Sequence, residues 1–341
     1  MGVTLQEAQN TLDEAVKVLY QSDPRVRSVG IGRHDDSYGF HVIRNAAQVL
    51  PLGEASGPPP LVIHNVPVAF QDRHTDVEPH VKLPFTGPGS PSVASLVPEQ
   101  RRHNPLVCGL QIENFDDDIR TATIAGGHFV IGTLGCFVIL SNGDTALLSN
   151  NHVVAGENRG VRSTDRITHP GSGTFLTADH VATLTDYVNI VSSAPGVTPA
   201  TGTVNFNDID AGVATLQSNV IHHQRYLPSR HVPAPSGTVP PAVHDHVFKI
   251  GRTTGLTHGI ITLITAVVGP IPYASGSTWF RRSIAIEGVN GTMFSDHGDS
   301  GSIVIKESTG EVIGLLYAGN GVDTFVCPID AVLTALNCQI A

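Results

Sequence analysis

The chain opens with an amphipathic helical pattern over residues 4–20. Thr4 and Glu7 have the spacing of a capping box, in which each side chain satisfies a free backbone amide at the start of a helix. Apolar residues then recur every three or four positions and predict one buried stripe: Leu5, Ala8, Leu12, Ala15, Val16 and Leu19. The pair Asp23-Pro24 predicts the end of the helix, because proline cannot continue helical hydrogen bonding.

Short apolar runs typical of strands follow this helix. Residues 26–32 and 38–43 are separated by a polar turn and predict a β-hairpin. Residues 61–70, after a Gly-Pro-Pro-Pro break, predict one further strand. We therefore expect residues 1–75 to form a small α+β module, and the proline-rich residues 76–120 to form a linker or a strap along the surface.

Residues 121–341 have a different pattern, in which short apolar runs alternate with Gly, Asn, Asp and Pro turns. The runs that we expect to be strands are 132–140, 145–148, 210–216, 247–250, 259–268, 284–287, 302–305, 312–317 and 324–328. This spacing indicates a sandwich or barrels rather than alternating strands and helices. Residues 228–241 predict a long surface loop and residues 329–336 a C-terminal helix. The predicted fold class is mainly β.

Composition and charge narrow the class of protein. The 341 residues are 40% hydrophobic and 15% charged, which excludes global disorder. The 35 glycines and 23 prolines favour a fold rich in turns. The net charge of −10 argues against nucleic-acid binding, because a surface that neutralises phosphates needs an excess of Lys and Arg.

The cysteines and the N-terminal residues bear on the cellular compartment of the protein. Cys108, Cys136, Cys327 and Cys338 have no CxxC or zinc-site spacing and are expected to be small buried thiols, with Cys108 and Cys136 the first pair to check for a disulfide. The N-terminus has no secretory signal pattern, and the most apolar stretch, 260–268, is about half as long as a membrane span. A cytoplasmic protein is expected.

The strongest chemical signal is the pentapeptide Gly298-Asp299-Ser300-Gly301-Ser302. A serine hydroxyl becomes a nucleophile when a base takes its proton and backbone amides await the oxyanion. The flanking glycines permit a tight turn that presents the hydroxyl, and the N–H groups of Gly298 and Ser300 are the expected oxyanion donors. Taken alone, the pentapeptide is equally a glycine-rich turn between two strands.

Two residues upstream complete a candidate triad. His152 follows the apolar run 146–148 and a polar corner of one serine and two asparagines, so we expect it at the end of a barrel strand. Asp210 precedes the small apolar run 211–214, where a buried carboxylate could orient an imidazole; Asp208 is the alternative. A lone His or Asp is more often structural, but the order His, Asp, Ser is that of chymotrypsin.

These segments resemble the bacterial and plant trypsin-fold peptidases related to the plant Narrow-leaf protein. The matching stretches are Gly126-Gly127, 132–136, 148–153, 169–171, Asp210-Ala211, 249–257 and 298–302. The resemblance covers roughly residues 120–341 and implies a chymotrypsin-like double β-barrel with His152, Asp210 and Ser300 as its triad. Residues 1–75 are weakly similar to the N-terminal region of the family. Two departures are Gly212, which predicts looser packing beside Asp210, and the insert at 228–241.

The residues beside the nucleophile suggest which substrates fit. Phe294 stands where trypsin-type specificity needs an acid, so cleavage after Lys or Arg is not expected. Tyr317, Ala318 and Gly319 are predicted to line a pocket for an apolar or small side chain. Residues 124–127 look like the activated N-terminus of digestive proteases, but Thr123 rather than a basic residue precedes them. We therefore expect the intact chain to be competent, or to be switched on by a partner through the N-terminal module.

Together these patterns predict an intracellular serine endopeptidase that acts on protein or peptide substrates. Neither a cofactor nor a metal is expected, and neither nucleic acid nor a membrane is an expected partner. Self-association or a regulatory partner through the N-terminal module stays open. The alternatives are a catalytically silent protease-fold binding or scaffold protein and an esterase-like hydrolase, because acyl-enzyme chemistry is common to peptidases and esterases.

Overall fold

The computed structural model describes residues 2–48, 59–79, 97–122, 130–171 and 180–341. Its helices are α1 (Leu5–Ser22), α2 (Phe115–Ala122), α3 (Asn151–Val154) and α4 (Ile329–Ala335), with 3-10 turns η2 (Pro98–Gln100), η4 (Pro228–Arg230) and η5 (Val289–Gly291). Its first strands are β1 (Val26–His34), β2 (Ser37–Asn45), β3 (Val62–Ile63), β4 (Val66–Arg73), β5 (Glu78–Pro79), β6 (Leu106–Val107), β7 (Gln111–Asn114), β8 (Ile131–Thr133), β9 (Cys136–Leu140), β10 (Thr145–Ser149), β11 (Arg166–Thr168) and β12 (His180–Tyr187). Its later strands are β13 (Ser192–Ser193), β14 (Phe206–Asn207), β15 (Gly212–Leu216), β16 (His222–His223), β17 (His246–Gly251), β18 (Gly255–Tyr273), β19 (Gly276–Gly288), β20 (Ile303–Lys306), β21 (Val312–Gly319), β22 (Asp323–Pro328) and β23 (Cys338–Ile340).

The N-terminal module is a helix packed on a small sheet, as predicted. The Thr4 and Glu7 side chains form the expected capping box at the start of α1. β1 and β2 form the predicted hairpin, and β4 lies parallel to β2. Residues 61–70 are not one strand, because left-handed backbone at His64 and Asn65 turns the chain between β3 and β4.

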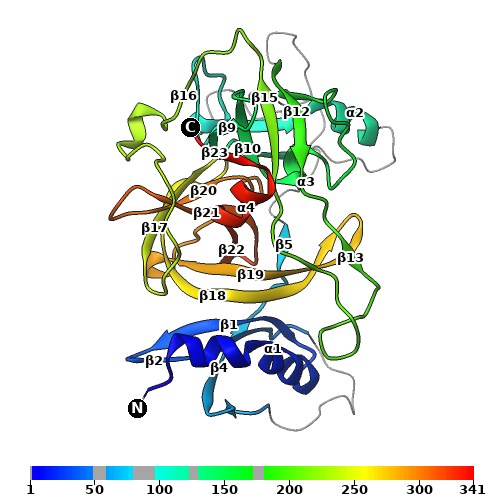
Figure 1. Cartoon of the computed structure of the whole chain (residues 1–341), viewed down its shortest axis with the longest axis vertical. Coiled ribbons are helices and arrows are strands. Elements are labelled where there is room, and N and C mark those ends of the chain that lie inside the picture. The colour runs from blue at the N-terminus through cyan, green and yellow to red at the C-terminus, as the bar shows by residue number, and fades with distance from the viewer. Residues whose placement is uncertain (1, 49–58, 80–96, 123–129, 172–179) are drawn as a thin grey trace.

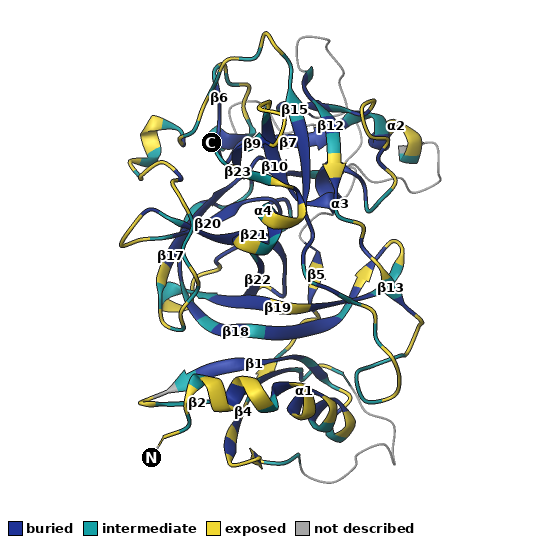
Figure 2. Ribbon diagram, viewed as in Figure 1, coloured by how far each residue is buried: buried dark blue, intermediate teal, exposed yellow. Residues whose placement is uncertain are grey.

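The middle of the molecule is a closed antiparallel barrel. Its strands run in the order β17, β18, β19, β22, β21, β20, and β20 pairs with β17 to complete the ring. The long β18 and β19 extend beyond this ring and curve below it in Figure 1. β20, β21 and β22 of the barrel are almost entirely buried, whereas β18 and β19 also carry half-buried and exposed residues. Loop tips and the outer side of α1 are exposed (Figure 2).

A second antiparallel sheet lies above the barrel in Figure 1. Its strand order is β23, β9, β10, β15, β12, β11, β7, β8. The predicted C-terminal helix is present as α4, and β23 then carries the chain end back to β9 of this upper sheet. The predicted fold class, mainly β with two barrel-like sheets and a small N-terminal α+β module, is confirmed.

The N-terminal module shares a sheet with the barrel. β1 pairs with β18, with Val29 opposite Val267, so one sheet runs from the barrel into the module. The ring of Tyr20 on α1 stands edge-on to the ring of Trp279 on β19, with 5.2 Å between centroids. The module is therefore joined to the barrel by a strand ladder and by buried aromatic contact.

Several smaller expectations can be checked against the described residues. The four cysteines are free thiols, and three of them are buried. Gly212 does not loosen the packing beside Asp210, because a Cβ there would lie 2.7 Å from Cγ2 of Val154. No helix in the described ranges is long and apolar enough to cross a membrane. Residues 124–127, the protease-like stretch, lie outside the described residues, as do residues 80–96 of the expected strap. The described end of that strap, residues 106–120, contains β6, β7 and most of α2.

Candidate active site

His152 is placed by the end of a buried strand. β10 runs into Asn150, which precedes α3, and the short helix places His152 fully inside the protein. The Asn150 side-chain amide donates to the backbone carbonyl of Asp210 at 2.6 Å. The His152 amide donates to Asp210 Oδ1 at 3.2 Å. The backbone around the imidazole is therefore fastened directly to the segment that carries Asp210.

Asp210 lies two residues before β15 and is fully buried. Its Oδ2 contacts Nδ1 of His152 and also accepts a hydrogen bond from the Tyr273 hydroxyl at 2.7 Å. Burial first, and the neighbouring carboxylate second, raise the pKa of Tyr273 well above its ordinary value, so the hydroxyl keeps the proton that it donates. With Nδ1 facing the carboxylate, Nε2 is the nitrogen that can take up a proton.

Asp208, the alternative carboxylate, lies elsewhere. It is on the surface, where its Oδ1 accepts from Nε of Arg281 at 2.7 Å. An ion-paired carboxylate on the surface has the structural role that is common for an aspartate in a turn. Of the two aspartates, the structure brings only Asp210 to His152.

Ser300 lies in a turn between η5 and β20 that depends on glycine. Gly298 and Gly301 have φ of +96° and +90°, a backbone region that other residues rarely adopt. A Cβ at Gly298 would lie 2.6 Å from Cδ of Arg252. The amides of Gly298 and Ser300 donate to no acceptor in the described part of the chain, so both are available to a ligand atom.

The His152 helix and the Ser300 turn are neighbours across the two sheets. Gly132 packs between them, because a Cβ there would lie 2.4 Å from Cγ2 of Val153 and 3.1 Å from the carbonyl oxygen of Ser300. The Ser300 hydroxyl donates to the backbone carbonyl of Tyr317 at 3.2 Å. Nε2 of His152 is buried and has no hydrogen-bond partner within the described ranges. The serine hydroxyl therefore faces β21 rather than the imidazole.

A buried ion pair supports the Ser300 turn from below. Nζ of Lys249 lies 3.4 Å from Oδ2 of Asp299, and both side chains are fully buried. Thr253 and Thr254 donate their amides to Asp299 Oδ1 at 2.8 and 3.2 Å. Burial opposes ionisation of Asp299, but the Lys249 ammonium and these donors outweigh it and hold the pKa of the carboxyl below its usual range.

Arg252 connects the Ser300 turn to the upper sheet. Its guanidinium donates twice to Oε1 of Gln111 on β7, at 2.9 and 2.6 Å. Its amide donates to the Thr133 hydroxyl, which in turn donates to the carbonyl of Gly298 at 2.9 Å. Burial lowers the pKa of Arg252 to about 10, so the group stays charged near neutral pH. Arg252 thus bridges the barrel and the upper sheet.

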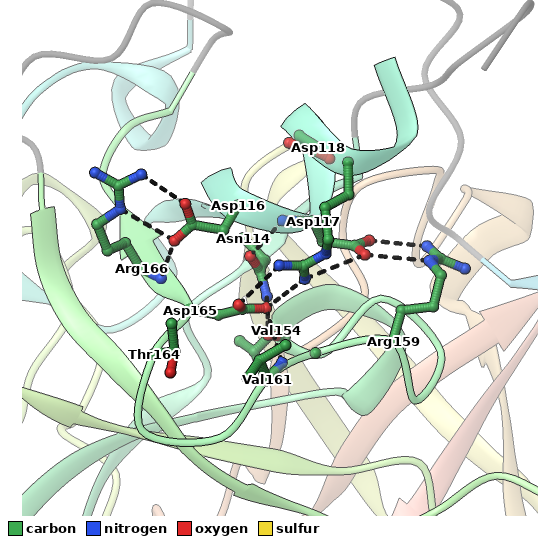
Figure 3. Close-up of polar contacts among 12 residues, drawn as sticks. Asn114, Asp116, Asp117, Asp118, Val154, Arg159, Val161, Thr164, Asp165 and Arg166 are labelled. Atoms are coloured by element: carbon green, nitrogen blue, oxygen red, sulfur yellow. Dashed lines mark hydrogen bonds and ion pairs between the residues drawn. The ribbon is translucent and has the colours of Figure 1, made fainter. Parts of the chain in front are cut away.

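A second polar network holds α3 from its other side. The Asn114 side-chain amide donates to the carbonyl of Val154 at 2.7 Å and to Asp165 Oδ2 at 3.0 Å. Asp165 also pairs with Arg120, and Arg159 pairs with Asp117 next to it (Figure 3). These contacts fix the end of α3, two residues beyond His152.

The expected substrate-side residues are all buried. Phe294 packs in the apolar cluster shared by the barrel and the N-terminal module, and its ring lies 5.9 Å from Nζ of Lys249. The Tyr317 hydroxyl hydrogen-bonds with Ser283 at 2.9 Å. Ala318 and Gly319 form the end of β21, and there they pair with β5.

Sequence reasoning did not find Lys249 or Tyr273 as parts of the site. Lys249 stands in the strand pattern Val247-Phe248-Lys249-Ile250, where a lysine among buried positions is itself a signal of a buried partner. Tyr273 lies at the far end of β18, and nothing local connects it with Asp210.

Comparison with known proteins finds similarity at the level of structure only. No family model and no curated protein matches the chain, so the Narrow-leaf resemblance stays a prediction. Cellulomonas bogoriensis chymotrypsin is similar at 17% identity and a TM-score of 0.44, over 69% of this chain and 97% of that one. Thermobifida fusca protease A is similar at 17% identity and a TM-score of 0.42, over 62% of this chain and 91% of that one. A Nocardiopsis protease is similar at 18% identity and a TM-score of 0.41, over 69% of this chain and 97% of that one. At such low identities and scores, the case for function depends on the site itself.

Proposed function

We propose that the chain is an intracellular serine endopeptidase. Ser300 Oγ attacks the peptide carbonyl while His152 Nε2 takes its proton and then passes that proton to the leaving amine. Asp210 holds the imidazole and stabilises its charged form. The amides of Gly298 and Ser300 hold the oxyanion, and water then hydrolyses the acyl-enzyme by the same steps.

The contact between the buried Asp210 carboxylate and His152 Nδ1 supports this proposal most directly. Removing a carboxylate and an imidazole from water costs solvation free energy, so such pairs are concentrated where proton transfer is needed. Tyr273 and the His152 amide hold the carboxylate in place, and Nε2 has no hydrogen-bond partner among the residues that the structure describes.

Catalysis in this scheme requires one small rearrangement. The Ser300 hydroxyl must leave the carbonyl of Tyr317 and turn toward Nε2 of His152. Rotation about the Cα–Cβ bond of a serine moves the hydroxyl between staggered positions without moving the backbone. Catalytic hydrogen bonds often tighten only when substrate is bound.

Covalent labelling with a fluorophosphonate tests the proposal. We expect the wild-type chain to be labelled at Ser300, and labelling to be lost in Ser300→Ala and in His152→Ala. Ser300→Ala should also lower kcat for a peptide substrate by about 10⁶ if the triad acts as a unit. Ser192→Ala, which changes a serine on β13, is the matched control and should be labelled like wild type.

Two other outcomes identify the alternatives. A folded chain that never reacts at Ser300 would be a silent binding or scaffold protein, an alternative favoured by the Ser300 hydrogen bond to Tyr317. Labelling at Ser300 with turnover of esters but not of peptides would indicate an esterase-like hydrolase, because both reactions pass through an acyl-enzyme.

A further inference from the structure

A short strand from the N-terminal part of the chain lies on the barrel edge beside Ser300. β5 pairs antiparallel with the end of β21, with Pro79 opposite Ala318 and Glu78 opposite Gly319. In Figure 1, β5 lies above β18 and β19, apart from the other strands of the N-terminal module. The next residue of β21 is Tyr317, whose carbonyl accepts the Ser300 hydroxyl. The paired positions are thus adjacent to the candidate nucleophile.

The residues just before this pairing fasten the segment to the barrel. The Val77 side chain is fully buried and belongs to the same apolar cluster as Tyr317 and Ala318, whereas most apolar residues of the module belong to another cluster. The Thr75 hydroxyl donates to the carbonyl of Asn320. Arg73 pairs with Asp323 on β22 at 2.7 Å. Residues 75–79 are therefore bound to the barrel by a buried side chain and by hydrogen bonds.

The direction of this segment is informative. Going from Glu78 to Pro79, the chain moves along β21 from Gly319 to Ala318, and so toward Tyr317 and Ser300. An extended peptide that adds to a sheet edge is held by backbone hydrogen bonds, with alternate side chains in pockets. Val77 and Pro79 are buried while Glu78 is exposed, which is that alternation. The segment lies as an extended peptide would lie on its way to the nucleophile.

We propose that residues 75–79 are a built-in competitor that occupies the peptide-binding edge of β21 and holds down turnover of peptide substrates. This inference rests on the proposed function for its biological meaning, but the occupancy itself is independent of catalysis. Because the competitor is part of the same chain, its effective concentration at the edge is high, and a free peptide binds only when the segment is displaced. Whatever releases the segment therefore raises activity toward peptides.

Weakening the segment tests this proposal. Val77→Ser removes the buried anchor, and Thr75→Ala is a milder variant that removes one hydrogen bond and keeps the apolar packing. Val62→Ser is the matched control, because Val62 is an exposed valine of β3 in the same module. We expect kcat/KM for an extended peptide to rise about tenfold or more in Val77→Ser, to rise less in Thr75→Ala, and to stay unchanged in Val62→Ser.

A binding measurement keeps the test independent of activity. Each variant is placed in a Ser300→Ala chain, and a fluorescent peptide with the sequence of residues 74–79 is titrated by anisotropy. We expect the Val77→Ser and Thr75→Ala chains to bind this peptide more tightly than the parent, about tenfold for Val77→Ser, and Val62→Ser to bind like the parent. Equal affinity in all four chains would overturn the proposal.

The two measurements separate the two proposals. If Ser300 is labelled but peptide affinity is the same in all variants, the built-in competitor is contradicted and the peptidase assignment stands. The reverse result is tighter peptide binding in the weakened variants while no variant is labelled at Ser300. It would support the proposal that residues 75–79 occupy the edge of β21, and it would contradict the peptidase assignment.

Discussion

Lys249 is an ammonium group buried in the middle of a barrel strand, and it faces Asp299 in the Ser300 turn. A charge in such a position is tolerated only with an opposite charge and hydrogen-bond acceptors around it. Lys249 has both, because it also donates to the carbonyl of Gly255 at 3.0 Å. Asp299 therefore has its cation within the intact chain, which fits the expectation that no freed terminal amine is needed.

Lys249→Met tests whether this pair positions the oxyanion donors. Breaking a buried pair by removing one partner costs about 3–5 kcal/mol of folding free energy. If the Ser300 turn also loses its shape, kcat for an ester should fall by about 10²-fold or more with KM nearly unchanged, as when an oxyanion donor is lost. Urea unfolding and steady-state kinetics measure the two effects separately.

A double variant distinguishes positioning from a merely structural role. Lys249→Met with Asp299→Asn removes both charges and should recover much of the lost stability. We expect kcat to stay low, because the neutral pair no longer holds the turn. Full recovery of kcat in the double variant would show that the ion pair contributes only to stability.

At the scale of residues, the sequence predicts the candidate triad but not the groups that surround it. The order of His152, Asp210 and Ser300 and the small residues after Asp210 are visible in the sequence. The Tyr273 hydroxyl and the carbonyl of Tyr317 reach the site through the packing of distant strands, so no local pattern predicts them. Gly212 illustrates the same limit, because its close contact with Val154 depends on how α3 packs on β15.

At the scale of elements, a buried histidine fastens the end of β11 to β7. Nδ1 of His169 donates to the carbonyl of Gln111 at 2.7 Å, and its Nε2 accepts from the amide of His103 at 3.0 Å. The bond accepted at Nε2 requires the neutral imidazole, because both ring nitrogens of a protonated histidine are donors. Burial is the main cause that lowers the pKa of His169 to about 4.

The stability of this junction should therefore depend on pH. The unfolded chain, with a pKa near 6.5, binds more protons than the folded one between about pH 6.5 and pH 4. The contribution is thus fully present above pH 6.5 and is lost as the pH falls, by about 2 kcal/mol between pH 7.5 and pH 5. Urea unfolding of the wild type and of His169→Asn at both pH values measures this difference. Equal losses in the two proteins would contradict it.

The boundaries of the helices and strands show which structural features a short stretch of sequence can predict. The ends of α1 and α4 were predictable, since a capping box or a change of pattern marks them. β18 runs over 19 residues, far beyond the predicted 259–268, because bulges along its pairing with β19 let an irregular pattern remain a strand. The two residues of β5 form a strand only through pairing with β21, and no sequence pattern reveals such a contact.

At the scale of the whole molecule, the N-terminal module and the barrel share both a sheet and a core. β1 continues the barrel through β18, and the single tryptophan, Trp279, lies against Tyr20 of α1. The residues that follow the sheet of the module also place β5 beside the end of β21. Disturbing the junction should therefore affect stability and, through residues 75–79, access to the candidate active site.

Trp279 is a natural reporter of this junction. Because the module and the barrel share one sheet, we expect Trp279 fluorescence and far-UV circular dichroism to give the same urea midpoint, as in a single cooperative transition. Gly30→Ala should lower the unfolding free energy by about 1–3 kcal/mol, because the new Cβ would lie 2.8 Å from Cβ of Ala266 on β18. Gly202→Ala, whose Cβ would meet only Cγ1 of Val197 at 3.3 Å, is the matched control and should be nearly neutral. Separate midpoints in the wild type would mean that the module unfolds on its own and that the shared sheet does not couple it to the barrel.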